Sequence, residues 1–256
     1  MRHDRQMLRR ASLSLVLLAA CAAPEDDWVV RPPGGGTGSM GVRIDGGPAD
    51  AGLDGGGGGL TGLVCVVDDL RQPDRCPIGA AATGVLVRRL GDVLGATSGS
   101  DARFTLAVTE PTVILDVAAD STTLQLTIVP VRTDGGLVHA PVPTAQAWTD
   151  TVASLEVAVA PGNGAIAVYT DSALGAPAAG VTFVQLAAGS GPFYDGAAST
   201  TWTIAGGTGD FGATLFVDLP PGIYGLDGNQ GARQVIVGSV PVVADAVTFV
   251  RAVLPP

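Results

Sequence analysis

The stretch "GTGDFGATLFVDLPPGIYGLD", from Gly207 to Asp227, places two tight turns around one apolar segment. Glycine and aspartate near Asp210 supply the first turn, which leads into Phe211, an aromatic residue able to plug one end of a core. Pro221 and Gly222 are typical of a type II turn, in which proline sets φ and glycine accepts a positive φ. Tyr224 then begins a strand, with a buried ring and a hydroxyl that needs a partner. This order of turns and strands predicts β-structure.

The same order of features occurs twice in the chain. The first copy has a strand from Gly62, then "CPIGAAATGVLV" (76–87) and "GSDARFTLAVTEPTVILDVAA" (99–119). The second has "GAIAVYTDSALGAPAAGVTFV" (164–184), followed by the stretch quoted above. Each copy reads as a first strand, a small-residue approach to a second strand, an aspartate turn ahead of a phenylalanine, and a final strand.

These motifs resemble the carboxypeptidase regulatory-like module, a transthyretin-like β-sandwich that is similar to the Cna-B type. The resemblance covers about 180 residues. The first copy departs from the pattern, with Ala102 where glycine is usual and "VTEPTVILDV" in place of Pro-Gly-x-Tyr. The resemblance implies two tandem sandwiches, at residues 61–160 and 161–256, in modules that serve as spacers, stalks or binding units.

The remaining pattern also favours an all-β fold. "ARFTLAV" (102–108) alternates, with its large apolar residues on one face, and turn signals separate it from further short strands. Strands are expected at "LEVAVA" (155–160) and "TTWTIAGG" (200–207), with a loop at "GSGPFYDG" (189–196). One short helix is expected over Pro143–Leu155. The last strand, from Val247, is apolar on both sides and should lie inside a sheet.

The N-terminus has the layout of a secretory signal peptide over residues 1–20. Basic residues precede an uncharged apolar run from Ala11 to Ala20, which is too short to span a bilayer. Leu18-Ala19-Ala20-Cys21 resembles the bacterial lipobox, which implies cleavage before Cys21 and lipidation of its thiol; an ordinary signal with a chance cysteine is the alternative. The resemblance implies an outer-membrane lipoprotein, because the residue after the cysteine is Ala22 rather than aspartate.

Residues 21–60 read as a flexible tether between the lipid and the folded part. From Arg31 to Leu60 the sequence is mostly glycine, proline, alanine and aspartate, which bury too little apolar surface to offset the entropy of ordering. Gly-rich chains reach about 5–6 Å times the square root of their length, or roughly 30 Å here.

Charge argues against nucleic acid as a partner. The chain has a net charge of −10 and no lysine, and loss of residues 1–20, with four arginines and one aspartate, makes it −13. Such a chain would be repelled by phosphate backbones and anionic lipid surfaces. The remaining partner classes are the membrane, through the lipid, and other envelope proteins or polysaccharide.

With Cys21 lipidated, Cys65 and Cys76 remain as an even pair, which in an exported protein indicates a disulfide. Closing a loop of about a dozen residues contributes roughly 3 kcal/mol in the chain-entropy model. Asp68, Asp69 and Asp74 lie inside this loop and offer hard oxygen ligands for Ca²⁺; an acidic solvated loop is the simpler interpretation.

No catalytic constellation is visible in the sequence. His139 is the one histidine after the signal peptide, and no Gly-x-Ser-x-Gly, His-Glu-x-x-His or P-loop lysine accompanies it. Glu110 and Glu156 are the only glutamates beyond the tether, so a carboxylate pair would need the fold to assemble it. We therefore expect no cofactor and no enzyme, with a hydrolase of hidden geometry as one alternative.

A carbohydrate site is the other alternative, because flat exposed aromatic rings bind sugars. The candidates are Phe193 and Tyr194, in the expected loop, and Trp202. The sequence thus predicts a non-enzymatic, lipid-anchored envelope protein of two β-sandwiches. It acts as a spacer, adhesion or protein-binding unit, or else binds carbohydrate or Ca²⁺.

Overall fold

The computed structural model describes residues 59–73, 82–118, 120–196 and 201–256, together with the backbone of 29–30 and 40–41. These residues form strands and one short helix, so the predicted all-β class is confirmed. The strands before the helix are β1 (Val29–Val30), β2 (Met40–Gly41), β3 (Gly59–Val67), β4 (Leu86–Arg89), β5 (Ala96–Thr97), β6 (Arg103–Ala107), β7 (Thr112–Val117), β8 (Thr127–Arg132) and β9 (Val138–Pro143). The helix is α1 (Ala145–Ser154). After it come β10 (Gly164–Ser172), β11 (Thr182–Phe183), β12 (Ser190–Tyr194), β13 (Ala213–Leu219), β14 (Gly222–Gln230), β15 (Arg233–Val242) and β16 (Val247–Leu254).

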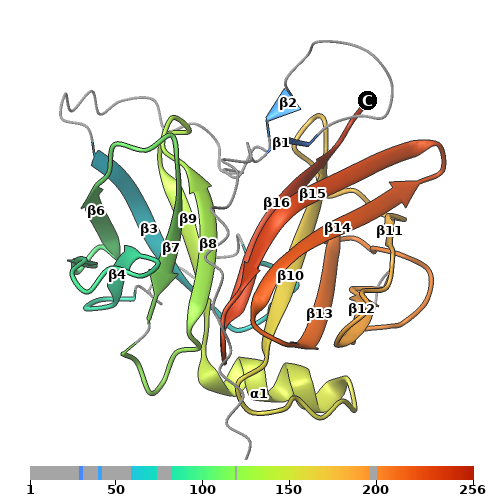
Figure 1. The fold of residues 1–256 in the computed structure, drawn as a ribbon, viewed down its shortest axis with the longest axis horizontal. Coiled ribbons are helices and arrows are strands. Elements are labelled where there is room, and N and C mark those ends of the chain that lie inside the picture. The colour runs from blue at the N-terminus through green and yellow to red at the C-terminus, as the bar shows by residue number, and fades with distance from the viewer. Residues whose placement is uncertain (1–28, 31–39, 42–58, 74–81, 119, 197–200) are drawn as a thin grey trace, which may run out of the picture.

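An eight-stranded sheet runs through both halves of the molecule (Figure 1), in the order β12-β13-β10-β16-β8-β7-β4-β5. Its two parts join where β16 pairs in parallel with β8, at Val247 opposite Thr127 and Thr248 opposite Ile128. The Val247 amide also donates to the Leu126 carbonyl at 3.0 Å. The final strand therefore lies between two others, as its apolar faces predicted.

Two three-stranded sheets complete two sandwiches. The sheet β6-β3-β9 packs on the β4-β7-β8 part, and β11-β14-β15 packs on the β13-β10-β16 part. Partners in a parallel ladder point to the same side, so the register at β8 and β16 relates the two cores. Thr248 pairs with Ile128. Thr248 lies on the face of β16 that carries the second core, whereas Ile128 lies on the face of β8 that is turned away from the first core. The two smaller sheets thus cover opposite faces of the long sheet.

The two halves repeat one strand topology. β3 pairs antiparallel with β6 and parallel with β9, and β10 pairs antiparallel with β13 and parallel with β16. The segments rich in small residues that lead into the second strand of each half also match, down to single hydrogen bonds. Ser98 Oγ accepts from the Val85 amide at 2.9 Å and donates to the Ala82 carbonyl at 2.5 Å.

Thr208 makes the same pair of bonds in the second half. Its Oγ1 accepts from the Val181 amide at 2.9 Å and donates to the Ala178 carbonyl at 2.6 Å. Both hydroxyl residues are buried. We call Ser98 and Thr208 hydroxyl clasps, because each hydroxyl bridges an amide and a carbonyl of the segment that leads into the second strand of its half.

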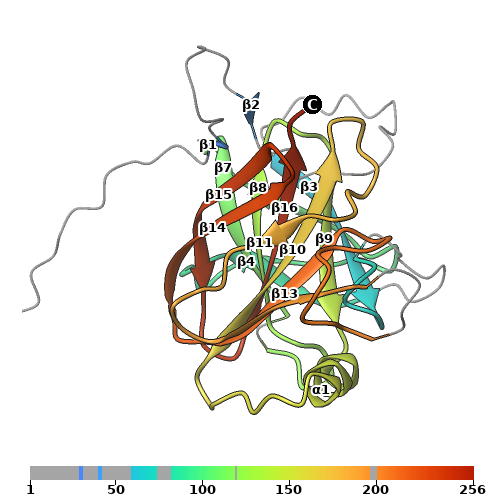
Figure 2. The same cartoon turned by 90° about the vertical axis from the view of Figure 1, so that its right-hand side faces the viewer.

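A third apolar cluster contains residues of both halves. The helix α1, which contributes to it, lies below the lower ends of the strands in Figure 2. The cluster lies on the outer face of the β13-β10-β16 sheet, which α1 and the segment 68–73 after β3 cover. Leu70, from this segment, is 1% exposed, and the Tyr169 hydroxyl on β10 donates to its carbonyl. The helix supplies Ala147, and Thr144 caps its N-terminus by accepting from the Ala147 amide at 3.0 Å. The predicted helix is confirmed, with Thr144 as its N-cap.

Several local expectations are wrong. Residues 156–160 form no strand, because α1 ends there and an irregular segment leads into β10. Residues 201–207 are irregular apart from a bridge at Thr203, whereas Ser190–Tyr194, expected as a loop, is strand β12. Gly222 has no positive φ and begins β14, so the type II turn is absent there.

The two turn phenylalanines are not equivalent either. Phe104 is 2% exposed in the first core, whereas Phe211 precedes β13 and lies at the edge of the third cluster. Tyr224 is half-buried, and its hydroxyl finds the expected partner in the Pro220 carbonyl at 2.7 Å.

Candidate functional site

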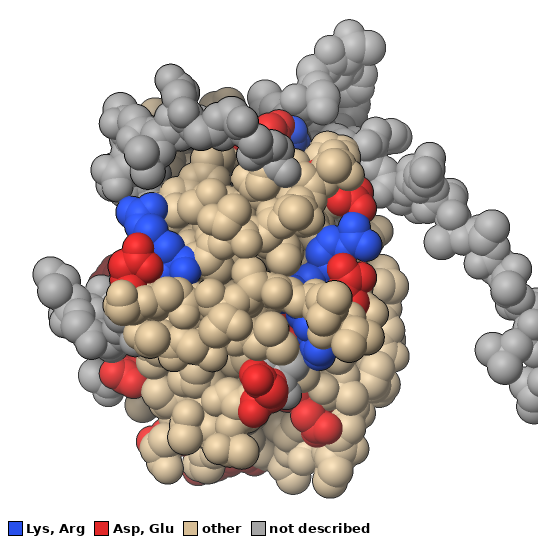
Figure 3. All heavy atoms as spheres, turned by 90° about the vertical axis from the view of Figure 1, so that its left-hand side faces the viewer, with Lys and Arg blue, Asp and Glu red and all other residues tan. Residues whose placement is uncertain are grey.

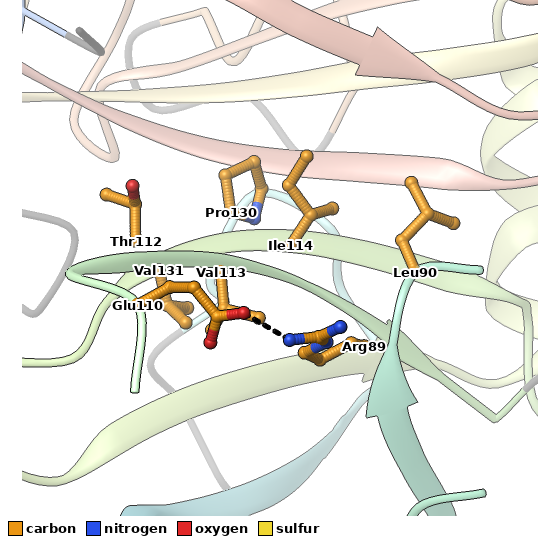
Figure 4. Close-up of a pocket in the computed structure, with 8 residues that line it drawn as sticks. All are labelled: Arg89, Leu90, Glu110, Thr112, Val113, Ile114, Pro130 and Val131. Carbon is orange, nitrogen blue, oxygen red and sulfur yellow. Dashed lines mark hydrogen bonds and ion pairs between the residues drawn. The ribbon is translucent and has the colours of Figure 1, made fainter. Parts of the chain in front are cut away.

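A groove of about 300 Å³ lies on the outer face of β7 and β8 and is the first candidate site (Figure 4). Ile114 and Pro130 form its apolar floor, because alternate residues of β7 and β8 point away from the first core. Arg89 and Glu110 form an ion pair at its rim, and Arg89 also reaches Asp92 at 3.0 Å. The groove is thus apolar inside, and the charged side chains at its edge are paired with one another.

The electrostatics of this rim do not suit acid catalysis. Backbone N–H groups, including the Thr109 amide at 3.1 Å, lower the pKa of Glu110, and Arg89 adds to the effect. The carboxyl therefore stays ionised at neutral pH and holds no proton to donate. A floor of aliphatic side chains with a paired rim suits contact with a polypeptide segment better than bond cleavage.

A second groove, of about 320 Å³, lies where the segment 68–73 meets the second sandwich. Arg71 binds Asp69 through two nitrogens, at 2.8 and 2.7 Å, and its guanidinium lies 5.8 Å from the centre of the Phe211 ring. On the opposite wall Arg251 contacts Asp171 at 2.9 Å. Each of these two arginines pairs with a carboxylate of its own half, and the contact of Arg71 with the Phe211 ring crosses from the first half to the second.

The pKa of Asp69 reflects this pairing. Burial alone raises it, but hydrogen bonds and the charge of Arg71 outweigh burial and lower the pKa below its ordinary value. A carboxylate committed to an arginine in this way is a poor ligand for a cation. Among the described residues, no group of three or more His, Cys, Asp or Glu side chains converges to hold a metal. Asp74, the third residue of the suggested Ca²⁺ loop, lies outside the described residues.

Asp195 is the buried polar residue that sequence reasoning missed. It is fully buried and accepts backbone N–H groups from Gly209, Phe211 and Ala213 at 2.7, 2.7 and 3.0 Å. Its carboxylate thereby fixes the turn before β13. The sequence signal was only an aspartate after two aromatics, which does not reveal donors that come from 14 to 18 residues further along the chain.

The proposed aromatic platform is not at the surface. Phe193 and Tyr194 are 7% and 4% exposed, and they point to opposite sides of β12, into the third cluster and the second core. The Tyr194 hydroxyl accepts from the Phe183 amide at 2.9 Å, and burial raises its pKa. Trp202 is half-buried against the third cluster. These rings build the fold, and Phe193 and Tyr194 present no face to a sugar.

The sequence also singled out the three cysteines and His139. Cys65 is buried on β3, but Cys76 lies outside the described residues, so the Cys65–Cys76 disulfide stays a prediction. Cys21 lies outside them as well, and its lipidation also stays a prediction. His139 sits on β9 beside Tyr169 and Phe249, where the strands of the long sheet diverge, and its Nδ1 has no hydrogen-bond partner within the described part of the chain.

The surface shows no patch of a single charge on the face drawn in Figure 3, where arginines and acidic residues alternate. Ion pairs elsewhere among the described residues join Arg88 with Asp116 at 3.0 Å and Arg103 with Asp101 at 3.9 Å. Within the described part of the chain, no helix is both long enough and apolar enough to cross a membrane.

Comparison with known proteins adds little to this geometry. No protein family matches the chain, and no curated protein matches it. Among solved structures the chain is similar to "The Bacillus anthracis TIE protein", with 10% identity and a TM-score of 0.23. That match covers 77% of this chain and 34% of the other, so the chain spans about a third of the length of that structure. A likeness this distant carries no conclusion about function.

Proposed function

We propose that the chain is a non-enzymatic, lipid-anchored envelope protein whose two β-sandwiches act together as one stiff spacer that presents a protein-binding face. The observation that supports this proposal best is the continuous sheet, which crosses from one sandwich to the other at Val247 and Thr127. Tandem domains on a simple linker would reorient freely, whereas a shared sheet resists bending.

The third apolar cluster supports the same proposal. Leu70 from the first half is buried against the second, and the Arg71–Phe211 contact and the Tyr169 hydroxyl bond surround it. The buried apolar contact lies on one side of the sheet, and the backbone pairing runs along the sheet. Together they oppose hinge motion between the two sandwiches in two directions. A spacer or stalk needs this resistance, whereas an enzyme that closes on a substrate needs a hinge.

The anchor completes the proposal. The lipobox at Leu18–Cys21 would attach the chain to the outer membrane, and the transthyretin-like modules would stand off from it. The Cys65–Cys76 disulfide would fix the base of the segment 68–73, which carries Leu70 and Arg71 into the second sandwich. The oxidising envelope would then favour the rigid arrangement.

Two measurements test the two parts of this proposal. Palmitate labelling of wild type should give a lipidated product that Cys21→Ala lacks, while Cys65→Ala keeps the label as the matched control; equal labelling of wild type and Cys21→Ala would refute the anchor. Small-angle scattering on the full chain in detergent should fit one rigid body for residues 59–256. A distribution that requires free reorientation of the two halves would refute the spacer.

A further inference from the structure

The loop between β4 and β5 carries two large aliphatic side chains in the open. Val93 and Leu94 are 85% and 84% exposed, whereas turns are usually built from glycine, proline and small polar residues. We call residues 91–95 the tip loop. Its two neighbouring aliphatic residues gain nothing from water, so their place at the surface needs a reason.

The fold fixes the tip loop at both ends. Before it, the Leu90 amide donates to the Ile114 carbonyl on β7 at 2.8 Å. At its end, Gly95 lies so close to β4 that a Cβ there would be 2.3 Å from the Val87 carbonyl oxygen. The exposure of the two aliphatic residues therefore belongs to an anchored turn, which holds them outward.

The tip loop adjoins the groove on β7 and β8. Leu90, the residue before the loop, lines the groove with Ile114 and Pro130, and Figure 4 shows these three side chains on one side of the two strands. Asp92, inside the loop, contacts Arg89 at the groove rim at 3.0 Å. A convex and a concave apolar feature thus lie next to each other within a polar rim, and such patches mark protein interfaces.

The chain does not cover this face with its own tip loop. Val93 and Leu94 are too exposed to fill the neighbouring groove. The groove, of about 300 Å³, is at the lower limit of small-molecule sites, and its charged lining residues, Arg89 and Glu110, bind each other. The face therefore suits the side chains of another polypeptide better than a small ligand.

Charge complementarity narrows the choice of partner. The whole chain has a net charge of −10, which by itself would select a basic partner. At this face, however, Asp92 and Glu110 are both paired with Arg89, so a basic partner would find both of these carboxylates already committed. A fitting partner is aliphatic at its centre and carries paired charges at its edge. A second copy of the same face has both properties.

We propose that the protein-binding face is formed by the groove and the tip loop, and that its partner is a second copy of the chain. This inference rests on the proposed function and names the partner. Two copies related by a two-fold axis place the tip loop of each against the groove of the other, so that both apolar features are covered at once. In the same contact Arg89 of each copy comes near Asp92 and Glu110 of the other. The assembly is a closed dimer, because one partner uses up each face.

Sedimentation velocity on the full chain, in an excess of detergent micelles, tests the dimer. The particle should contain one chain at low protein concentration and two at high concentration. The double variant Val93→Asp/Leu94→Asp should raise the dissociation constant about a hundredfold or more, because each interface then buries charge in place of two aliphatic side chains. The matched control Leu174→Asp/Ile204→Asp adds the same charge at residues that are 95% and 78% exposed outside this face, and should leave the constant unchanged.

Photo-cross-linking identifies what the tip loop touches. A photoreactive side chain at position 93 should link to the peptide that holds Ile114 or Pro130. A mixture of isotope-labelled and unlabelled chains shows that the link joins two copies. The same photoreactive group at position 174, outside the face, should give no such link.

The outcomes that overturn the dimer are distinct. They are a particle with one chain at every concentration, a dimer that Val93→Asp/Leu94→Asp leaves intact, and an equal loss in the control variant. Links from position 93 to detergent alone would assign the tip loop to the membrane and overturn the dimer as well. Thermal melting at a concentration where wild type is monomeric separates association from folding: the double variant should melt within about 2 °C of wild type, because it alters only exposed residues.

The proposed spacer fails separately from this dimer. A monomer whose scattering fits one rigid body leaves the spacer standing and removes the dimer. A dimer that depends on the tip loop but needs free reorientation of the two halves does the reverse.

Discussion

At the scale of single residues, the two halves resemble each other more closely in their hydrogen bonds than in the identity of their side chains. Ser98 and Thr208 differ by a methyl group, yet each joins a buried amide to a carbonyl three residues before it. A buried amide and carbonyl without partners cost free energy, so the hydroxyl is the conserved requirement within the repeat. The aromatic residues near the same turns serve different clusters, because nothing in the turn fixes them.

The clasps give the first prediction. Thr208→Val keeps the shape and removes the hydroxyl, which leaves the Val181 amide and the Ala178 carbonyl without their partner. We expect the free energy of unfolding in urea to fall by about 1–3 kcal/mol. Thr149→Val, an exposed threonine on α1, is the control and should change it by less than about 0.5 kcal/mol. Equal losses would mean that the clasp is not a source of stability.

Ala102 gives a second prediction, with the opposite sign. Its φ is +61°, in the left-handed region, whereas Gly212 holds the corresponding place before β13 with φ +66°. Ala102→Gly should relieve the strain and raise the free energy of unfolding by about 0.5–1 kcal/mol. Ala107→Gly, in the extended strand β6, should lower it by about as much. A loss at both positions in the same urea titration would contradict the strain argument.

At the scale of elements, the segment 68–73 is the unit that decides how the halves meet. It follows β3 of the first sandwich, but Leu70 packs among residues of the second, and the Arg71 guanidinium lies over the Phe211 ring of the second. Pairing with Asp69 lets Arg71 lie near Phe211 without an uncompensated charge. The helix α1 completes the cover, and Thr144 fixes where it begins.

The Asp69–Arg71 pair makes the junction sensitive to acid. Because the pKa of Asp69 is lowered in the folded state, its stabilising contribution is present above the ordinary pKa of aspartate, near 4, and is lost as pH falls through the lowered value. Asp69→Asn should therefore destabilise the chain at pH 7 and have a smaller effect near pH 2–3. Unfolding in urea at both pH values, with the exposed Asp150→Asn as control, measures the difference. An equal loss at both values would show that ionisation of Asp69 is not involved.

At the scale of the whole molecule, the continuous sheet and the third cluster predict that both sandwiches unfold together. Leu70 is the residue on which this coupling depends most. It belongs to the first half, but its side chain is buried among residues of the second. Leu70→Ala should cost about 2–5 kcal/mol and divide the calorimetric transition into two. Leu174→Ala, at a leucine that is 95% exposed, should retain one transition close to that of wild type. A single unshifted transition in Leu70→Ala would mean that the shared sheet alone couples the halves.

The sequence predicted those features that depend on short-range order. Alternation and turn residues predicted the all-β class, the helix at 143–155 and the buried position of the strand from Val247, because side-chain periodicity reports which faces meet a core. It failed for Phe193 and Trp202, since an apolar residue beside glycines fits a loop and a strand equally well. The tether was assigned by composition, and it stays a prediction because nearly all of residues 21–58 lie outside the described residues.

The site features that matter most came from contacts between distant residues. The carboxylate of Asp195 finds its amide donors across a turn, Leu70 finds its cluster on the other sandwich, and the groove exists because β7 and β8 turn Ile114 and Pro130 away from their own core. Composition and periodicity determined that this chain forms β-sandwiches. Only the tertiary structure decided that they share one sheet, because the pairing of β8 with β16 depends on how two finished cores pack and not on any local preference of either strand.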